Sequence, residues 1–200
     1  MRQHHGVSVR LATHVASANN CKQKNSFPIA TPTDSFHSQS RRTAVCCCSC
    51  HIRNEGNSCR SPMAEAVLKD MVAREALDWV VDSAAIADWN VGYPPEDRCL
   101  AILRENGLDS NHIGRQIGKD DFERFDYIFG MDEGNVSDLK ALAPDQCRAQ
   151  IELLGRYRMK ELDKIIFDPY FERGVHGFRR CYTQIVICCQ NFIQQKRSIG

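Results

Sequence analysis

The sequence predicts an α/β fold of three layers: a doubly wound, four-stranded parallel sheet with helices on both faces and a phosphate loop after the first strand. Short apolar segments alternate with amphipathic segments of helical period from residue 44 onward. Such alternation favours a parallel sheet with ligands at the carboxyl ends of its strands. A loop containing Gly56 precedes a helix start, and this arrangement offers converging N–H groups to a phosphate.

The first strand begins near residue 44, because a short, continuous apolar run is typical of a buried parallel strand. Its end is open between two alternatives. A strand that stops at Cys50 leaves residues 51–55 as an insertion before Gly56. A strand that continues to Arg53 places His51 and Arg53 where burial on both faces disfavours them.

The first helix is predicted to start with Ser61 as N-cap and Pro62 in the first turn, and Glu65 lies near its positive end. Gly107 is expected to end the second helix, and Pro144 the helix that starts at residue 135. The last helix is predicted from the helical spacing of its apolar residues. Strands are predicted over residues 79–86, 126–131 and 149–155, and helices over 63–75, 95–106, 119–125, 135–143 and 175–195.

Composition is typical of one globular domain, with 42% hydrophobic and 26% charged residues in 200. We expect this domain to span residues 44–200. Residues 1–43 lack an apolar period and are expected to be a disordered or unrelated tail, for instance from a different first exon. A mitochondrial transit peptide fits less well, because only two arginines precede position 41.

No apolar run approaches the ~20 residues that span a bilayer, and no secretory signal is apparent. We therefore expect a cytoplasmic protein with no membrane partner. The basic residues of the first 54 positions are scattered and lack interleaved aromatics, which argues against a nucleic-acid partner.

The chain has 11 cysteines, and we expect reduced thiols in that compartment. Cys46, Cys47, Cys48, Cys50 and His51 lie close together, but a zinc site usually draws on two separated pairs of ligands and no second CxxC exists. We expect neither a metal nor another cofactor.

The stretch Gly56-Asn-Ser-Cys-Arg-Ser-Pro62 resembles the active-site loop of the low-molecular-weight protein tyrosine phosphatases, in which a cysteine is followed by five residues, an arginine, and a serine or threonine. The chain also resembles eukaryotic members in Asp82-Ser-Ala, His112-Ile-Gly-Arg-Gln-Ile, Asp126-Tyr-Ile and Met131-Asp-Glu. Asp168-Pro-Tyr-Phe171 resembles the acid loop of the family, a name kept here for residues 168–171. The resemblance extends from Gly56 to about Lys196.

The resemblance implies a role for each matching residue. Arg60 and the loop amides bind and stabilise the phosphoryl group, and Asp168 is the proton donor. Ser83 supports the loop, His112 is a structural hydrogen-bonding residue, and Asp132 braces the loop. The implied substrate-binding residues are Gly56, Asn57, Ser58, Cys59, Ser61, Trp89, Tyr170 and Phe171.

Taken without the resemblance, several of these residues have ordinary explanations. Ser83 is a strand-end hydroxyl that satisfies local backbone, Trp89 is a partly buried packing residue, and Asp-Pro is common in turns.

The position of the family's nucleophilic cysteine, six residues before Arg60, is occupied by Asn54. A carboxamide has no thiolate form, so we expect activity to be lost or greatly reduced. Two other cysteines lie near the loop in the sequence and are candidate substitutes. Cys59 matches a second loop cysteine whose side chain is expected to point away from phosphorus, and Cys50 would make the loop four residues longer than in the family.

Three functional hypotheses follow. The first is a phosphatase for phosphotyrosine proteins and small aryl phosphates, working through a phosphocysteine and largely inactive in this chain. The second is a non-catalytic phosphotyrosine-binding pseudophosphatase. The third, an arsenate reductase, is disfavoured by the aromatic acid loop. Inorganic phosphate is an expected ligand, and a monomer or weak dimer is the expected state.

Overall fold

A sheet of four parallel strands forms the centre of the domain, in the order β2-β1-β3-β4. The computed structural model describes residues 43–48 and 57–198. The strands are β1 (Thr43–Cys48), β2 (Val80–Ala85), β3 (Tyr127–Gly130) and β4 (Gln150–Leu153). Because β1 pairs with β2 on one side and β3 on the other, the sheet winds outward in both directions, which confirms the predicted doubly wound topology.

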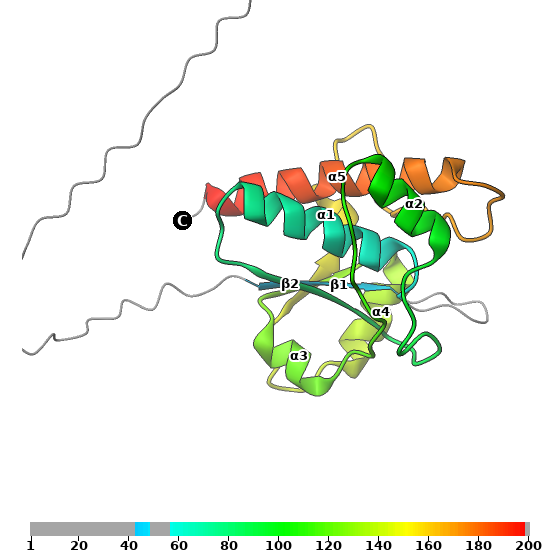
Figure 1. Ribbon diagram of the computed structural model, residues 1–200. Coiled ribbons are helices and arrows are strands. Elements are labelled where there is room, and N and C mark those ends of the chain that lie inside the picture. The colour runs from blue at the N-terminus through cyan, green and yellow to red at the C-terminus, as the bar shows by residue number, and fades with distance from the viewer. Residues whose placement is uncertain (1–42, 49–56, 199–200) are drawn as a thin grey trace, which may run out of the picture. The chain divides into compact units, whose positions relative to one another are not determined.

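Helices cover both faces of this sheet (Figure 1). One face carries α1 (Arg60–Arg74), α2 (Asp97–Glu105) and α5 (His176–Arg197), and the other carries α3 (Lys119–Arg124) and α4 (Glu133–Leu142). A 3₁₀ turn, η1 (Leu154–Tyr157), follows β4. Successive strand residues face opposite layers: Phe129 belongs to the α1/α5 core, whereas Ile128 belongs to the α3/α4 core.

The core between the sheet and α5 is built around Phe192, which is fully buried. Its ring lies 4.9 Å from Phe129, 5.0 Å from Tyr157, 5.2 Å from Tyr127 and 5.6 Å from Trp79, between ring centroids. These edge-on and tilted contacts are favoured by the aromatic quadrupole. They tie the last helix to β3 and η1, and so fix the chain on either side of the segment that carries Asp168.

The start of α1 differs from its prediction. Ser61 is not the N-cap, because the helix begins at Arg60 and the amide of Met63 already donates to the carbonyl of Cys59 at 3.2 Å. The hydroxyl of Ser61 instead donates to Asn57 Oδ1 at 2.6 Å. Arg60 therefore lies inside the first turn and not in a loop.

The other boundaries shift by a few residues. α4 begins two residues earlier than predicted because the Asp132 carboxylate caps it by accepting from the amide of Asn135 at 2.8 Å. α2 begins two residues later, since Glu96 is extended. The residues that would decide where the first strand ends, 49–56, lie outside the described residues. The same is true of residues 1–42, so the expected tail also stays a prediction.

Among the residues that the structure describes, none of the helices combines the length and apolar character needed to cross a bilayer. The longest, α5, has 22 residues.

Replacing Phe192 with alanine should lower the free energy of unfolding by about 3–5 kcal/mol, because the ring leaves a cavity among four aromatic neighbours. Urea unfolding measures this change. Phe171, whose side chain is 66% exposed, is the matched control, and Phe171→Ala should cost less than about 0.5 kcal/mol. Equal losses in the two variants would show that the aromatic cluster does not stabilise the domain.

Candidate active site

Arg60 lies at the carboxyl edge of the sheet and is only 2% exposed. Its guanidinium forms ion pairs with Asp132 Oδ2 at 3.0 Å and Asp168 Oδ2 at 3.1 Å, and donates to the carbonyl of Ile166 at 3.2 Å. These partners follow β3 and η1. Three predicted site residues that are far apart in the sequence therefore meet at one group.

The turn before α1 is held by Asn57, which is buried and has a left-handed backbone with φ of 58°. Asparagine adopts this conformation more readily than most residues. Its Oδ1 accepts from the hydroxyl of Ser61, and its Nδ2 lies 2.6 Å from His112 Nε2. The side chain of Asn57 thus joins the phosphate loop to the segment after α2.

His112 continues this chain of hydrogen bonds into the core. Its Nε2 faces the side-chain amide of Asn57, and its Nδ1 lies 2.8 Å from Glu65 Oε2, so a proton on Nδ1 can be donated to this carboxylate. The same carboxylate oxygen accepts from the hydroxyl of Ser83 at 2.5 Å. Ser83 therefore contacts the loop indirectly, through Glu65 and His112.

The carboxylate of Glu65 is ionised in this network. Burial by itself would raise its pKa, but hydrogen bonds from His112, Lys69 and Ser83 outweigh burial and lower the pKa from 4.5 to about 2. The prediction treated Glu65 as a charge that favours the helix start, and its part in the loop support was missed. Glu65 lies between Ala64 and Ala66, and all three are buried. A charged residue flanked by small apolar residues was the feature of the sequence that could have indicated its burial.

The thiol of Cys59 lies against α2. It is 5% exposed, and Sγ donates to Glu96 Oε2 at 3.8 Å. The carbonyl of Ser58 accepts from the amide of Glu96 at 2.9 Å, and the carbonyl of Cys59 from the thiol of Cys99 at 3.4 Å. Glu96 was not singled out from the sequence, although it ties the phosphate loop to α2.

Of the three predicted aromatic residues, Phe171 and Trp89 are exposed and Tyr170 is half-buried. Tyr170 and Phe171 pack edge to face, with ring centroids 5.0 Å apart. Phe171 is 66% exposed and Trp89 51%. The loop that carries Trp89 is tied by two 2.8 Å backbone bonds between residues 92–93 and Gly114, where a Cβ atom would lie 2.1 Å from the carbonyl of Asn90.

Asn54 and Gly56 lie outside the described residues. The structure brings together Arg60, Asp132 and Asp168 at one group, and Asn57, Ser61, Ser83 and His112 in one network. The role of Trp89 in the substrate pocket stays a prediction.

One group of side chains has the spacing of a metal site. Ligand atoms of Glu65, Asp82 and His112 lie within 4.8 Å of one another. However, Glu65 is bonded to Lys69, Ser83 and His112, and Asp82 pairs with Arg115 at 2.9 Å. These internal partners account for the cluster without a cation.

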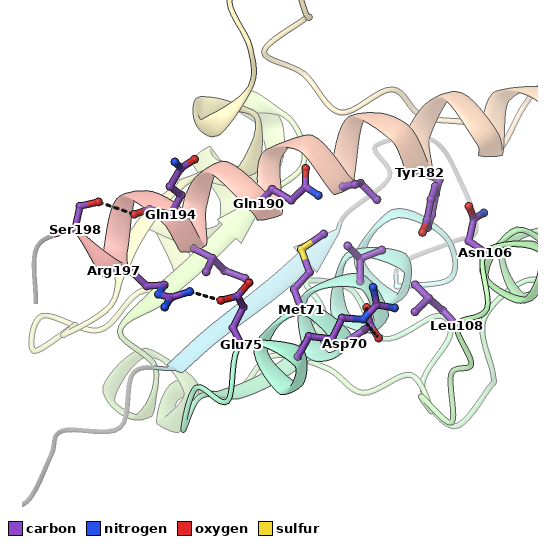
Figure 2. A pocket seen from close by; sticks show the side chains of 14 residues that line it. Asp70, Met71, Glu75, Asn106, Leu108, Tyr182, Gln190, Gln194, Arg197 and Ser198 are labelled. Atoms are coloured by element: carbon purple, nitrogen blue, oxygen red, sulfur yellow. Dashed lines mark hydrogen bonds and ion pairs between the residues drawn. The ribbon is translucent and has the colours of Figure 1, made fainter.

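A separate cavity of about 650 Å³ lies between α1 and α5 (Figure 2). Met71 and Leu108 contribute to its apolar part, while the charged groups at its edge pair with each other, Asp70 with Arg74 and Glu75 with Arg197. None of the predicted site residues lines this cavity. It is therefore distinct from the site around Arg60.

Replacing Glu65 with glutamine should destabilise the fold in a pH-dependent manner. Because the folded pKa of about 2 is below the ordinary value of 4.5, ionised Glu65 stabilises the protein above pH 4.5, and this contribution is lost as the pH falls toward 2. Glu65→Gln should cost about 3 kcal/mol near neutral pH, with the difference shrinking over that interval.

Urea unfolding as a function of pH measures this difference, and Glu123→Gln at an exposed position of α3 is the control. A difference between Glu65→Gln and the unmodified chain that is constant from neutral pH to pH 3 would contradict the account.

Comparison with known proteins agrees with this arrangement. The model of the family low molecular weight phosphotyrosine protein phosphatase matches residues 51–198. The chain is 46% identical over 142 residues to low molecular weight phosphotyrosine protein phosphatase 1 of Drosophila melanogaster, covering 70% of this chain and 92% of the relative. It is also 46% identical over 147 residues to the Sus scrofa protein, covering 71% and 91%.

Solved structures give the same result. The crystal structure of Primo-1 superimposes with a TM-score of 0.71 at 44% identity, covering 76% of this chain and 97% of the other. DARP, a Drosophila arginine phosphatase, superimposes with a TM-score of 0.70 at 42% identity, covering 78% and 97%. Sequence and fold together place this chain in the low molecular weight phosphotyrosine protein phosphatase family.

Proposed function

We propose that the site around Arg60 binds phosphotyrosine and small aryl phosphate monoesters, and that hydrolysis is lost or greatly reduced because Asn54 occupies the nucleophile position. The observation that carries the binding half is the buried Arg60 guanidinium, held in place by Asp132 and Asp168. We infer that residues 44–200 form the phosphatase-like domain, that residues 1–43 lie outside it, and that the protein acts in the cytoplasm.

The chemistry that this site supports has two halves. A planar guanidinium and a helix N-terminus stabilise the equatorial oxygens of a phosphoryl group. Asp168 lies 3.1 Å from that guanidinium, where a carboxyl group can protonate a departing phenolate and later act as base toward water. Arg60 and Asp168, which we propose for these two parts of the chemistry, form an ion pair with each other.

The missing part is the nucleophile. Covalent catalysis splits one difficult step into two easier ones only when a thiolate attacks phosphorus to form a phosphocysteine. Asn54 supplies no thiolate, and a loss of ~10⁵ in rate corresponds to about 7 kcal/mol of barrier. Cys59 is an unsuitable substitute because its thiol donates to Glu96 at the start of α2.

A second candidate function is phosphotyrosine binding without turnover. It is favoured by the intact hydrogen-bond network from Ser61 through Asn57 and His112 to Glu65. A neutral carboxamide at position 54 also places no negative charge beside the phosphate, so the affinity for a dianion is expected to survive the loss of catalysis.

Asn54→Cys should raise p-nitrophenyl phosphate hydrolysis by about 10³-fold or more, because it restores the nucleophile. Steady-state kinetics of the full chain and the variant measure this change. If the unmodified chain hydrolyses p-nitrophenyl phosphate as fast as Asn54→Cys does, position 54 does not limit catalysis and the proposal is wrong. Phosphoarginine belongs among the substrates tested, since one of the similar structures is an arginine phosphatase.

Arg60→Lys should weaken vanadate binding to the unmodified chain by about tenfold or more, because lysine keeps the charge and loses the two-pronged donor. Titration calorimetry measures the affinity. Arg74→Lys, an exposed position at the end of the same helix, is the control and should bind as the unmodified chain does. Unchanged affinity in Arg60→Lys would mean that the anion binds elsewhere.

A further inference from the structure

We propose that Arg98, held by Glu96, is a positioning residue that fixes the acid loop against the phosphate loop and thereby places Asp168. This inference rests on the proposed function, since the position of Asp168 matters for catalysis only if the site acts on phosphate esters. Arg98 lies in the first turn of α2.

The guanidinium of Arg98 contacts the backbone just after Asp168. One terminal nitrogen donates to the carbonyl of Glu172 at 2.7 Å, and the other to the carbonyl of Tyr170 at 3.2 Å. The group also lies over the ring of Phe178 in α5, 4.7 Å from its centroid. A fork of donors stacked on an aromatic ring is a geometry that arginine provides and lysine does not.

Glu96 connects this contact to the phosphate loop. Arg98 Nε donates to Glu96 Oε1. The other carboxylate oxygen accepts from the thiol of Cys59, and the amide of Glu96 donates to the carbonyl of Ser58 at 2.9 Å. Glu96 and Arg98 therefore form a continuous bridge from the turn that precedes Arg60 to the carbonyls that follow Asp168.

The two ends of the acid loop are held differently. Before Asp168, the amide of Ile166 donates to the carbonyl of Met131 and the amide of Phe167 to Gln184 Oε1, both at 2.9 Å. After it, the amide of Tyr170 donates to Asp168 Oδ1 and the amide of Glu172 to the carbonyl of Pro169, both at 3.1 Å and both within the same short segment. Arg98, from a distant part of the chain, donates to the carbonyls of both residues in this second half.

Amide hydrogen exchange in the full, unmodified chain and in Arg98→Met tests the bridge without any need for turnover. Methionine keeps an apolar contact with Phe178 and removes the donors. The amides of Tyr170 and Glu172 should exchange about tenfold faster, while those of Ile166 and Phe167 should be unchanged. Arg104→Met, at an exposed position of the same helix, should alter none of the four.

Unchanged exchange at Tyr170 and Glu172 would overturn the proposal. Equal acceleration of all four amides would overturn it as well, because it would indicate a general loss of stability and not a local release of the acid loop.

The catalytic consequence is measured in the Asn54→Cys background. A displaced general acid should harm poor leaving groups most, so Arg98→Met should lower kcat/KM, which reports the first, leaving-group-dependent step, about tenfold for phenyl phosphate and less for p-nitrophenyl phosphate. Arg98→Lys should recover part of the loss. Equal losses for the two substrates would contradict a role in placing Asp168. If Asn54→Cys itself fails to turn over, the proposed function fails, and amide exchange still decides whether Arg98 fixes the acid loop.

Discussion

The ion pairs of the buried Arg60 guanidinium determine how the carboxyl edge of the sheet is assembled. A buried cation is tolerated only when fixed anionic and polar groups compensate its desolvation. Here those groups are Asp132, Asp168 and the carbonyl of Ile166, which come from the ends of two other βα units. The need to satisfy this one charge therefore brings the start of α1, the end of β3 and the acid loop to one point.

The compensation of the Arg60 charge concerns the residues proposed for phosphate binding and does not involve the nucleophile position. The groups that we propose bind a phosphoryl dianion are held by the fold: Arg60 by its carboxylates, and the turn at Asn57 by His112 and Glu65. In the proposed function the nucleophile position is residue 54, which precedes that support in the sequence. We therefore expect a change at this position to remove catalysis while leaving phosphate binding intact, so the two candidate functions differ in turnover and not in ligand.

Much of this arrangement could be predicted from sequence, because strand and helix alternation reports the parallel sheet directly and the Gly-Asn-Ser-Cys-Arg-Ser-Pro stretch marks its ligand-binding edge. What could not be predicted depends on tertiary contacts. Ser61 was expected to cap a helix, yet its hydroxyl turns to Asn57. Glu65 and Arg98 look like ordinary helix-surface charges, and their partners, Ser83 and the carbonyls after Asp168, are distant in the chain.

Intact-mass spectrometry after rapid acid quenching with an aryl phosphate substrate tests the central claim most directly, namely that the phosphate site is present and the nucleophile is absent. The account predicts that no phosphoryl group is added to the unmodified chain, and that one is added to Asn54→Cys. A phosphorylated cysteine trapped in the unmodified chain would contradict it, and the position of that cysteine would identify the true nucleophile.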